Sequence, residues 1–268
     1  MLPSRFRDMI DYVKAHACGN DFLIIDESLA HGRHAELARA MCSRHTGIGA
    51  DGIEFVDGRK IRLFNSDGSE AEISGNGTRC VAAWLAHLTG TQELVLDTHA
   101  GLRTCRVVSS MNNHFEIESE MGTPTVAAGT FRYRQQEIAG VIVSTGNPHF
   151  VLFVDTDDFS YNGLPWVELG REICESPKFP NGTNVEFVRV LSREAIAIRI
   201  YERGAGPTTS SGTGSCAAAA ASMTMRGLSR RLRVEAPGGS QQVVWERPDT
   251  QILLTGPADL IAKGEAFL

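Results

Sequence analysis

Two short segments of the sequence carry the same residues, of kinds that could hold an anion and move a proton. Each has a serine followed by Gly-x-Gly, in "SGNGTRC" from Ser74 and in "SGTGSCA" from Ser211. The alanine-rich run after each motif predicts a helix. Backbone N–H groups at the start of a helix lack internal partners and lie at the positive end of its dipole. Each motif is therefore a candidate cradle for a carboxylate or a phosphate.

A simpler interpretation applies to either motif taken alone. The serine could be the N-cap of a buried helix, with the glycines serving only the turn. The duplication favours a functional interpretation, in which a serine flanks each face of one ligand. The segment "GTGSCA" also fits the dinucleotide pattern G-x-G-x-x-A, but "YERGAGPTTSS" separates it from the preceding strand. A Rossmann turn follows its strand directly, so this match is weak.

The motifs belong to a longer internal repeat. A shift of 137 positions places Ile61–Thr78 on Ile198–Ser215 without a gap. Upstream, "IEFV" matches "VEFV" and "GNDFLII" resembles "GNPHFVLFV", in the same order. Three matches in one order predict that the chain consists of two homologous halves.

Short runs rich in Val, Ile and Leu, such as "ELVLDT" and "AIAIRI", predict strands in both halves. The central helices are expected over "RCVAAWLAHL" and "SCAAAAASMTM", and lesser helices over "HAELARAMCSRH" and "PWVELGREICE". The expected fold class is α+β, with two pseudo-symmetric domains, each a curved, mainly antiparallel sheet wrapped around a central helix. The domains are predicted at residues 1–122 and 123–255.

Composition excludes several classes of protein. The formal net charge of −6 gives no electrostatic support for binding nucleic acid or an anionic membrane. No run of about 18 apolar residues is present, and the first residues lack the apolar centre of a signal peptide. The six cysteines are scattered, without a CxxC or a metal-like spacing. They predict the reduced thiols of a cytoplasmic protein with no metal site.

Five blocks of the sequence resemble the signature blocks of the diaminopimelate epimerase family. They are "GNDFLIID", "FNSDGSEAEISGNGTRC", "GNPHFV", "NVEFV" and "ERGAGPTTSSGTGSCAAAA". The resemblance implies a cofactor-independent epimerase that interconverts LL- and meso-diaminopimelate by two-base α-proton transfer in lysine and peptidoglycan biosynthesis. It also implies a small amino-acid substrate and a last strand, 256–268, that returns to the first domain. A homodimer is left open.

The sequence departs from that family at the two positions that move protons. The family has a cysteine at each, whereas this chain has Ser74 and Ser211. A thiol has a pKa of roughly 8.5 and a helix start lowers it, but a serine hydroxyl needs an adjacent base. Two explanations stay open: an inactivated Cys-to-Ser form, or a natural relative with altered chemistry.

The resemblance assigns further roles residue by residue. Glu202 and His149 would tune and orient the proton-transferring residues, and Arg203 would pair with the distal carboxylate of the substrate. A glutamine that some members have after G-x-D is Gly52 here, so that contact is in doubt. The substrate-binding positions carried over are Asn20, Asn65, Gly75, Asn76, Asn147, Asn184, Glu202, Arg203, Gly212 and Thr213.

Other functions compete with the epimerase. An isomerase or dehydratase on the same scaffold would use Glu202 or His149 as a single base. A non-catalytic amino-acid binder would have kept the pocket and lost the bases. A serine hydrolase lacks its G-x-S-x-G elbow, and no lysine lies in a signature block to hold pyridoxal phosphate. Cys80 and Cys216 are expected to be buried small residues rather than displaced catalytic thiols.

Overall fold

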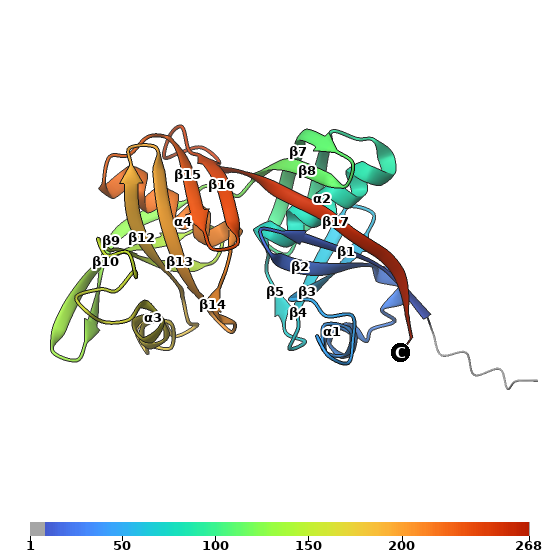
Figure 1. Cartoon of the computed structure of the whole chain (residues 1–268), viewed down its shortest axis with the longest axis horizontal. Helices are drawn as coiled ribbons and strands as arrows, with labels where there is room; N and C mark the ends of the chain where they lie inside the picture. Colours follow the sequence, from blue (N-terminus) through green and yellow to red (C-terminus); the bar gives the residue numbers. More distant parts are fainter. Residues whose placement is uncertain (1–8, 268) are drawn as a thin grey trace, which may run out of the picture. The chain divides into compact units, whose positions relative to one another are not determined.

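The computed structural model describes residues 9–267 and is drawn as a ribbon in Figure 1. The chain forms two compact units. The first contains the described residues up to Ile117 and those from Pro257 onward, and the second is Glu118–Gly256. The boundaries between the units lie after residues 117 and 256. The sequence analysis predicted them after residues 122 and 255.

The strands of the first unit pair in a fixed order. Strand β17 is antiparallel to β1, β1 to β2, β3 to β4, and β6 to β7. The pairs β2–β3 and β4–β6 are parallel, and β8 pairs with β17. The elements are β1 (Met9–Ala17), β2 (Asn20–Asp26), the 3-10 helix η1 (Glu27–Leu29), α1 (His34–Met41), β3 (Gly52–Asp57), β4 (Lys60–Asn65), β5 (Glu70–Ala71), α2 (Gly75–Thr89), β6 (Glu93–Thr98), β7 (Gly101–Met111), β8 (His114–Glu120) and, from residue 257 on, β17 (Leu253–Phe267).

The second unit repeats that order. Strand β9 is antiparallel to β10, β10 to β11, β12 to β13, β15 to β16, and β16 to the start of β17. The pairs β11–β12 and β13–β15 are parallel, in the same places as β2–β3 and β4–β6. The repeat predicted from the sequence is therefore confirmed in the strand order. The elements are β9 (Thr125–Tyr133), β10 (Gln136–Ser144), β11 (Pro148–Phe153), α3 (Trp166–Cys174), β12 (Asn184–Ser192), β13 (Ala195–Glu202), β14 (Gly206–Thr208), α4 (Gly212–Met225), β15 (Arg231–Ala236) and β16 (Gly239–Val244).

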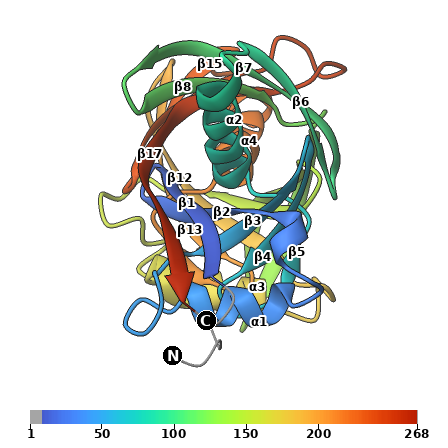
Figure 2. The same ribbon diagram turned by 90° about the vertical axis from the view of Figure 1, so that its right-hand side faces the viewer.

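A central helix lies inside the curved sheet of each unit. Helix α2 packs against β1, β2, β3, β6 and β7, and Figure 2 shows it enclosed by strands of its own unit. Helix α4 packs against β9 to β13, β15 and β16, and its residues 212–223 are all buried. A helix that is apolar on every side must be surrounded, and its alanines let the strands approach closely. The predicted fold class is confirmed.

The two lesser helices cover the other face of each sheet. Helix α1 packs on β4, and α3 packs on β12 and β13. Each forms a second apolar core, around Leu37 in the first unit and around Leu169 in the second. Within residues 9–267 the helices are all too short or too polar to cross a membrane.

Candidate active site

Both central helices begin at the first glycine of their motif, one turn earlier than the alanine runs predicted. The glycines therefore form the first turn of each helix and do not precede it. Ser74 is the N-cap of α2, with φ −120° and ψ 122°, and its Oγ accepts from Gly77 N at 3.1 Å. Ser211 is the N-cap of α4, with φ −145° and ψ 126°, and accepts from Gly214 N at 3.2 Å. The N-cap interpretation is confirmed for both serines.

Capping and ligand binding use different N–H groups. The helix bonds begin when Thr78 N and Ser215 N donate to the N-cap carbonyl oxygens, at 2.8 and 2.9 Å. The helix itself supplies no acceptor for the N–H groups of its first two residues. These residues are Gly75 and Asn76 in α2, and Gly212 and Thr213 in α4. Each helix start can thus be capped by its serine and still present N–H groups to a carboxylate.

The second glycine of each motif makes room for a buried carboxyl group. A Cβ on Gly77 would lie 2.0 Å from Glu54 Oε1, and a Cβ on Gly214 would lie 2.9 Å from Glu186 Oε1. The space beside Gly77 and Gly214 is therefore filled by a side chain of the protein.

These two glutamates were missed by sequence reasoning. Glu54 is 1% exposed and Glu186 is 0% exposed, both in the middle of apolar strands. Burial raises the pKa of Glu54 to about 8. Burial also raises the pKa of Glu186, and nearby His149 partly offsets this rise. The signal was present, since "IEFV" and "VEFV" repeat one glutamate at one place in an otherwise apolar run.

In the first unit the predicted residues join a chain of side-chain amides. Buried Arg79 donates to Gly75 O at 3.0 Å and to Asn76 Oδ1 at 2.6 Å. Asn76 Nδ2 donates to Asn20 Oδ1 at 3.1 Å, and Asn20 Nδ2 donates to Asp51 Oδ2 at 2.7 Å. The structure therefore brings Asn20 and Asn76 together, behind a buried cation that the sequence analysis did not identify.

Two other first-unit positions lie near the end of β4. Asn65 is its last residue, and its Nδ2 donates to Ser69 Oγ at 3.0 Å across the following turn. Gly52 pairs with Asn65 on the adjacent strand β3. A Cβ at Gly52 would lie only 2.8 Å from Phe64 O. The glutamine found there in some family members would need a shift of this backbone.

In the second unit a hydrogen-bonded chain runs from a buried carboxyl group to the helix start. Glu186 Oε1 lies 2.7 Å from His149 Nδ1, and His149 Nε2 lies 2.9 Å from Asn147 Oδ1. Asn147 Nδ2 donates to Thr213 Oγ1 at 3.4 Å. Thr213 Oγ1 in turn lies 3.5 Å from Ser211 Oγ. The structure thus connects three predicted site residues to one serine.

Glu202 is the last residue of strand β13, and Arg203 follows it directly. Burial raises the pKa of the Glu202 carboxyl above its ordinary value, and the nearby hydroxyls of Ser211 and Thr208 partly offset this rise. Asn184 Oδ1 accepts from the backbone N–H of Arg203 at 2.9 Å. A carboxyl group close to Ser211 is the kind of neighbour a hydroxyl needs in order to exchange a proton.

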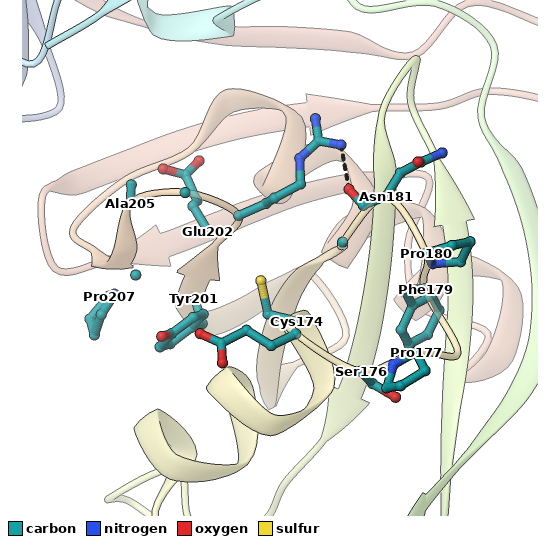
Figure 3. A pocket seen from close by; sticks show the side chains of 15 residues that line it. Cys174, Ser176, Pro177, Phe179, Pro180, Asn181, Tyr201, Glu202, Ala205 and Pro207 are labelled. Carbon is teal, nitrogen blue, oxygen red and sulfur yellow. Dashed lines mark hydrogen bonds between the residues drawn. The ribbon is translucent and has the colours of Figure 1, made fainter. Parts of the chain in front are cut away.

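A pocket of about 740 Å³ opens beside these residues, lined by the segments 174–177, 179–182 and 201–207. Figure 3 shows Glu202 and Tyr201 on one of these segments and Asn181 on another. Arg203 Nη1 donates a hydrogen bond to Asn181 O at 2.9 Å. A Cβ on Gly182 would lie 2.8 Å from Arg203 Cδ. The loop that contains Gly182 therefore holds the stem of this exposed arginine.

The cysteines of the helix starts do not replace the missing thiols. Cys80 and Cys216 are both 0% exposed, and burial raises the pKa of the Cys80 thiol. A neutral thiol inside the apolar core does not act as a base. The prediction that both are buried small residues is confirmed.

Solved structures of an epimerase and of a phenazine biosynthesis protein share this fold. A hydroxyproline epimerase from Agrobacterium vitis, with bound trans-4-OH-L-proline, has a TM-score of 0.72 at 17% identity and covers 98% of this chain and 92% of that one. A phenazine biosynthesis protein of the PhzF family from Bacillus anthracis has a TM-score of 0.68 at 16% identity and covers 97% and 100%. At these identities the likeness shows the fold alone.

Sequence relatives identify the family of the chain. The family model described as diaminopimelate epimerase matches residues 12–127 and 141–261. The diaminopimelate epimerase of Rippkaea orientalis is 36% identical and covers 95% of this chain and 98% of its own length. That of Moorella thermoacetica is also 36% identical, with the same two coverages of 95% and 98%. The chain belongs to the diaminopimelate epimerase family.

Proposed function

We propose that the chain has the scaffold of an epimerase that interconverts LL- and meso-diaminopimelate in lysine biosynthesis. One observation carries the proposal: two equivalent helix starts, each capped by the residue that stands at a proton-transferring position of the family. An N-cap side chain lies beside the N–H groups that would bind the carboxylate of the reacting centre. A helix start therefore provides an anion site, from its backbone N–H groups, and a proton-transferring group, from its N-cap side chain.

The rest of the proposed site fits a diamino dicarboxylic acid. The N–H groups of a helix start would bind a carboxylate of the substrate and stabilise a carbanion-like transition state. The asparagines would hydrogen-bond the amino and carboxylate groups. Arg203 would hold the distal carboxylate, since a guanidinium binds carboxylates with two parallel hydrogen bonds. No metal or cofactor is needed for these steps as we propose them.

The two serines limit the chemistry of this chain. A hydroxyl removes an α-proton only with help from a neighbouring base. Ser211 has Glu202 near it, whereas the carboxyl group packed against the Ser74 motif, at Gly77, is the buried Glu54. We therefore propose that the Ser/Ser chain binds the substrate and turns it over slowly or not at all.

The position of Glu202 near Ser211 also favours a second candidate function. A carboxyl group with a raised pKa is suited to act as a general base or acid near neutral pH. A single-base isomerase or dehydratase would then use Glu202 alone and would not need Ser74. A chain in which neither reaction occurs would be a non-catalytic amino-acid binder.

Binding of diaminopimelate tests the site without requiring turnover. Calorimetry with meso-diaminopimelate should show binding to the unmutated chain. Arg203→Ala should weaken it by about 2–3 kcal/mol, the scale of a charge-assisted pair that loses one partner. The matched control is Arg199→Ala in β13, the strand that Arg203 follows. The guanidinium of Arg199 lies over Phe159 at 4.2 Å from the ring centroid, and this variant should bind normally.

Two results would contradict this assignment. If the unmutated chain binds no diaminopimelate, the proposed substrate is wrong. If Arg203→Ala and Arg199→Ala bind equally well, Arg203 does not hold the distal carboxylate.

We also propose that the chain works in the cytoplasm with a small-molecule partner only. Its six cysteines are all buried and unbonded to one another, as a reducing compartment maintains them. The net charge of −6 argues against nucleic acid as a partner. Sedimentation of the purified chain with and without diaminopimelate would decide between a monomer and a homodimer.

A further inference from the structure

The pair Glu186–His149 is completely buried in the second unit. Glu186 lies in β12 and His149 in the parallel neighbour β11, and both side chains are 0% exposed. Their closest atoms, Oε1 and Nδ1, are 2.7 Å apart. Burying two titratable groups costs free energy unless they satisfy each other. The second unit therefore contains a buried pair that costs free energy, next to the start of helix α4.

The second ring nitrogen of His149 determines the orientation of Asn147. Nε2 lies 2.9 Å from Asn147 Oδ1, which also accepts from Thr145 Oγ1 at 3.2 Å. An amide oxygen only accepts, so Nε2 must carry a proton. With its oxygen held there, Asn147 turns its Nδ2 toward Thr213 Oγ1. The orientation of the amide thus depends on which nitrogen of His149 is protonated.

Glu186 secures that protonation state. A carboxylic acid at 186 would donate to Nδ1 of a neutral ring, and a carboxylate would accept from Nδ1 of an imidazolium. In both cases the proton on Nε2 remains, whereas a carboxylate beside a neutral ring protonated on Nδ1 would leave Nε2 bare against the acceptor Asn147 Oδ1, which excludes that pairing. Without an acid or a donor at 186, the ring could move its proton to Nδ1. The bare Nε2 would then repel Asn147 Oδ1, and the amide would turn over.

We propose that Glu186 is a positioning residue, which keeps the proton of His149 on Nε2 and thereby directs the amide nitrogen of Asn147 toward the start of helix α4. The effect on substrate binding rests on the function proposed above, because it assumes that Asn147 contacts the substrate. The effect on His149 itself does not depend on any substrate. The two effects can therefore be measured separately.

The first unit shows that the fold does not require this pair. Glu54 occupies the place of Glu186, and Phe22 that of His149, since Phe22 pairs with Gly52 as His149 pairs with Asn184. Among residues 9–267, neither carboxyl oxygen of Glu54 has a hydrogen-bond partner. A buried glutamate alone is thus compatible with the same strand order. The histidine and its chain to the helix start are an addition in the second unit.

Nitrogen-15 NMR of the histidine rings tests the first effect in the whole chain, with His149 assigned by the signal lost in His149→Gln. The unmutated chain should show Nε2 protonated. Glu186→Gln should keep that signature, because its amide can donate to Nδ1. Glu186→Met should lose the signature of a protonated Nε2. Glu54→Met, the matched control, should leave that signature unchanged. A folded Glu186→Met protein with the unmutated ring signature would overturn the proposal.

Calorimetry with meso-diaminopimelate tests the second effect. Glu186→Met should weaken binding about tenfold, the loss of roughly one good hydrogen bond, whereas Glu186→Gln and Glu54→Met should stay within about twofold. If Glu186→Met does not fold, His149→Phe, which copies the first unit, should show the same tenfold loss. Equal losses in Glu54→Met and Glu186→Met would mean a general packing effect and would reject the positioning role. Absence of binding by the unmutated chain would reject the proposed substrate, and the NMR result would still decide on Glu186.

Discussion

The helix starts at Ser74 and Ser211 have the same backbone and different chemical surroundings. Each has an extended N-cap serine bonded to the third residue of its helix and a buried glutamate against the second glycine. At Ser74 the glutamate has no hydrogen-bond partner, and a buried arginine lies against the first turn. At Ser211 the glutamate is hydrogen-bonded to a histidine, and a second carboxyl group lies near the serine.

Three equivalent positions account for the difference. Phe22, Asn65 and Arg79 in the first unit correspond to His149, Glu202 and Cys216 in the second, by strand register and by the shift of 137. The repeat has kept the residues that shape the backbone and changed those that carry charge. Each helix start has a buried glutamate, but the first also has a nearby cation and the second has another carboxyl group. In a two-base reaction one group starts as base and the other as acid, so unequal surroundings would favour unequal roles.

The largest expected effect comes from restoring thiols at both helix starts. Ser74→Cys with Ser211→Cys should raise the rate of α-proton exchange from diaminopimelate in D₂O by roughly three orders of magnitude or more, because thiolates form at neutral pH and alkoxides do not. Each single change should achieve much less, since one face would still lack its base or acid. Exchange is followed by NMR, separately for the LL and meso isomers.

Two outcomes would contradict this prediction. A double-cysteine protein that binds diaminopimelate and exchanges no proton would point to a binder or to different chemistry. Exchange at an enzymatic rate by the serine form would mean that hydroxyl acidity is not limiting, and would direct attention to Glu202.

The second effect concerns the unpaired glutamate and stability. Burial raises the pKa of Glu54 from an ordinary 4.5 to about 8, so between these pH values the folded chain holds a proton that the unfolded chain has lost. The contribution of Glu54 to the free energy of unfolding therefore falls as the pH rises through that range and stays constant above it. Glu54→Met should remove the loss and raise the free energy of unfolding at pH 8 by on the order of 2–4 kcal/mol, with a smaller gain at pH 5.

Glu186→Met is the matched comparison for this stability experiment. It should lower the free energy of unfolding by about 1–3 kcal/mol, because it leaves the buried His149 without its partner. Urea unfolding of the three proteins at pH 5 and pH 8 measures both effects. If Glu54→Met and the unmutated chain lose stability in parallel as the pH rises, Glu54 is not the group that titrates.

The smallest effect compares the two helix starts directly. In the single variants Ser74→Cys and Ser211→Cys, the thiol at 74 should titrate about one pH unit below the thiol at 211. The guanidinium of Arg79 donates to the carbonyl oxygen of Gly75, next to position 74, whereas Glu202 lies near position 211. Alkylation rates against pH report the titration, and the six buried native cysteines of the unmutated chain give the background.

Adding Glu202→Gln to Ser211→Cys should bring its titration closer to that of Ser74→Cys, because the carboxyl group that disfavours a thiolate is gone. Equal titration of the two single variants from the start would show that the charge difference between the helix starts has no influence on the groups they hold.

The sequence by itself determined the repeat, the central helices and the family. These follow from signals between near neighbours in the chain, namely apolar runs of strand length, alanine runs and the Ser-Gly-x-Gly motifs. The strand over "ELVLDT" was predicted at its exact bounds, Glu93–Thr98. The helix starts were placed one turn too late, because a glycine in a first turn is indistinguishable from one in a preceding loop until its capping bond is seen.

Only the tertiary structure decided which side chains became partners. Arg79 would be a surface residue by type, yet it is fully buried, since Pro257 O and the first turn of its own helix accept its hydrogen bonds. Glu54 and Glu186 occupy equivalent positions of the repeat, but of these two only Glu186 is hydrogen-bonded to a histidine. Burial, and the partner available within hydrogen-bond reach, depend on strands that are 30 or more residues apart, as in the 37-residue separation of His149 and Glu186. Local patterns fix the backbone of each helix start, whereas the charge around it is set by residues that only the folded sheet brings together.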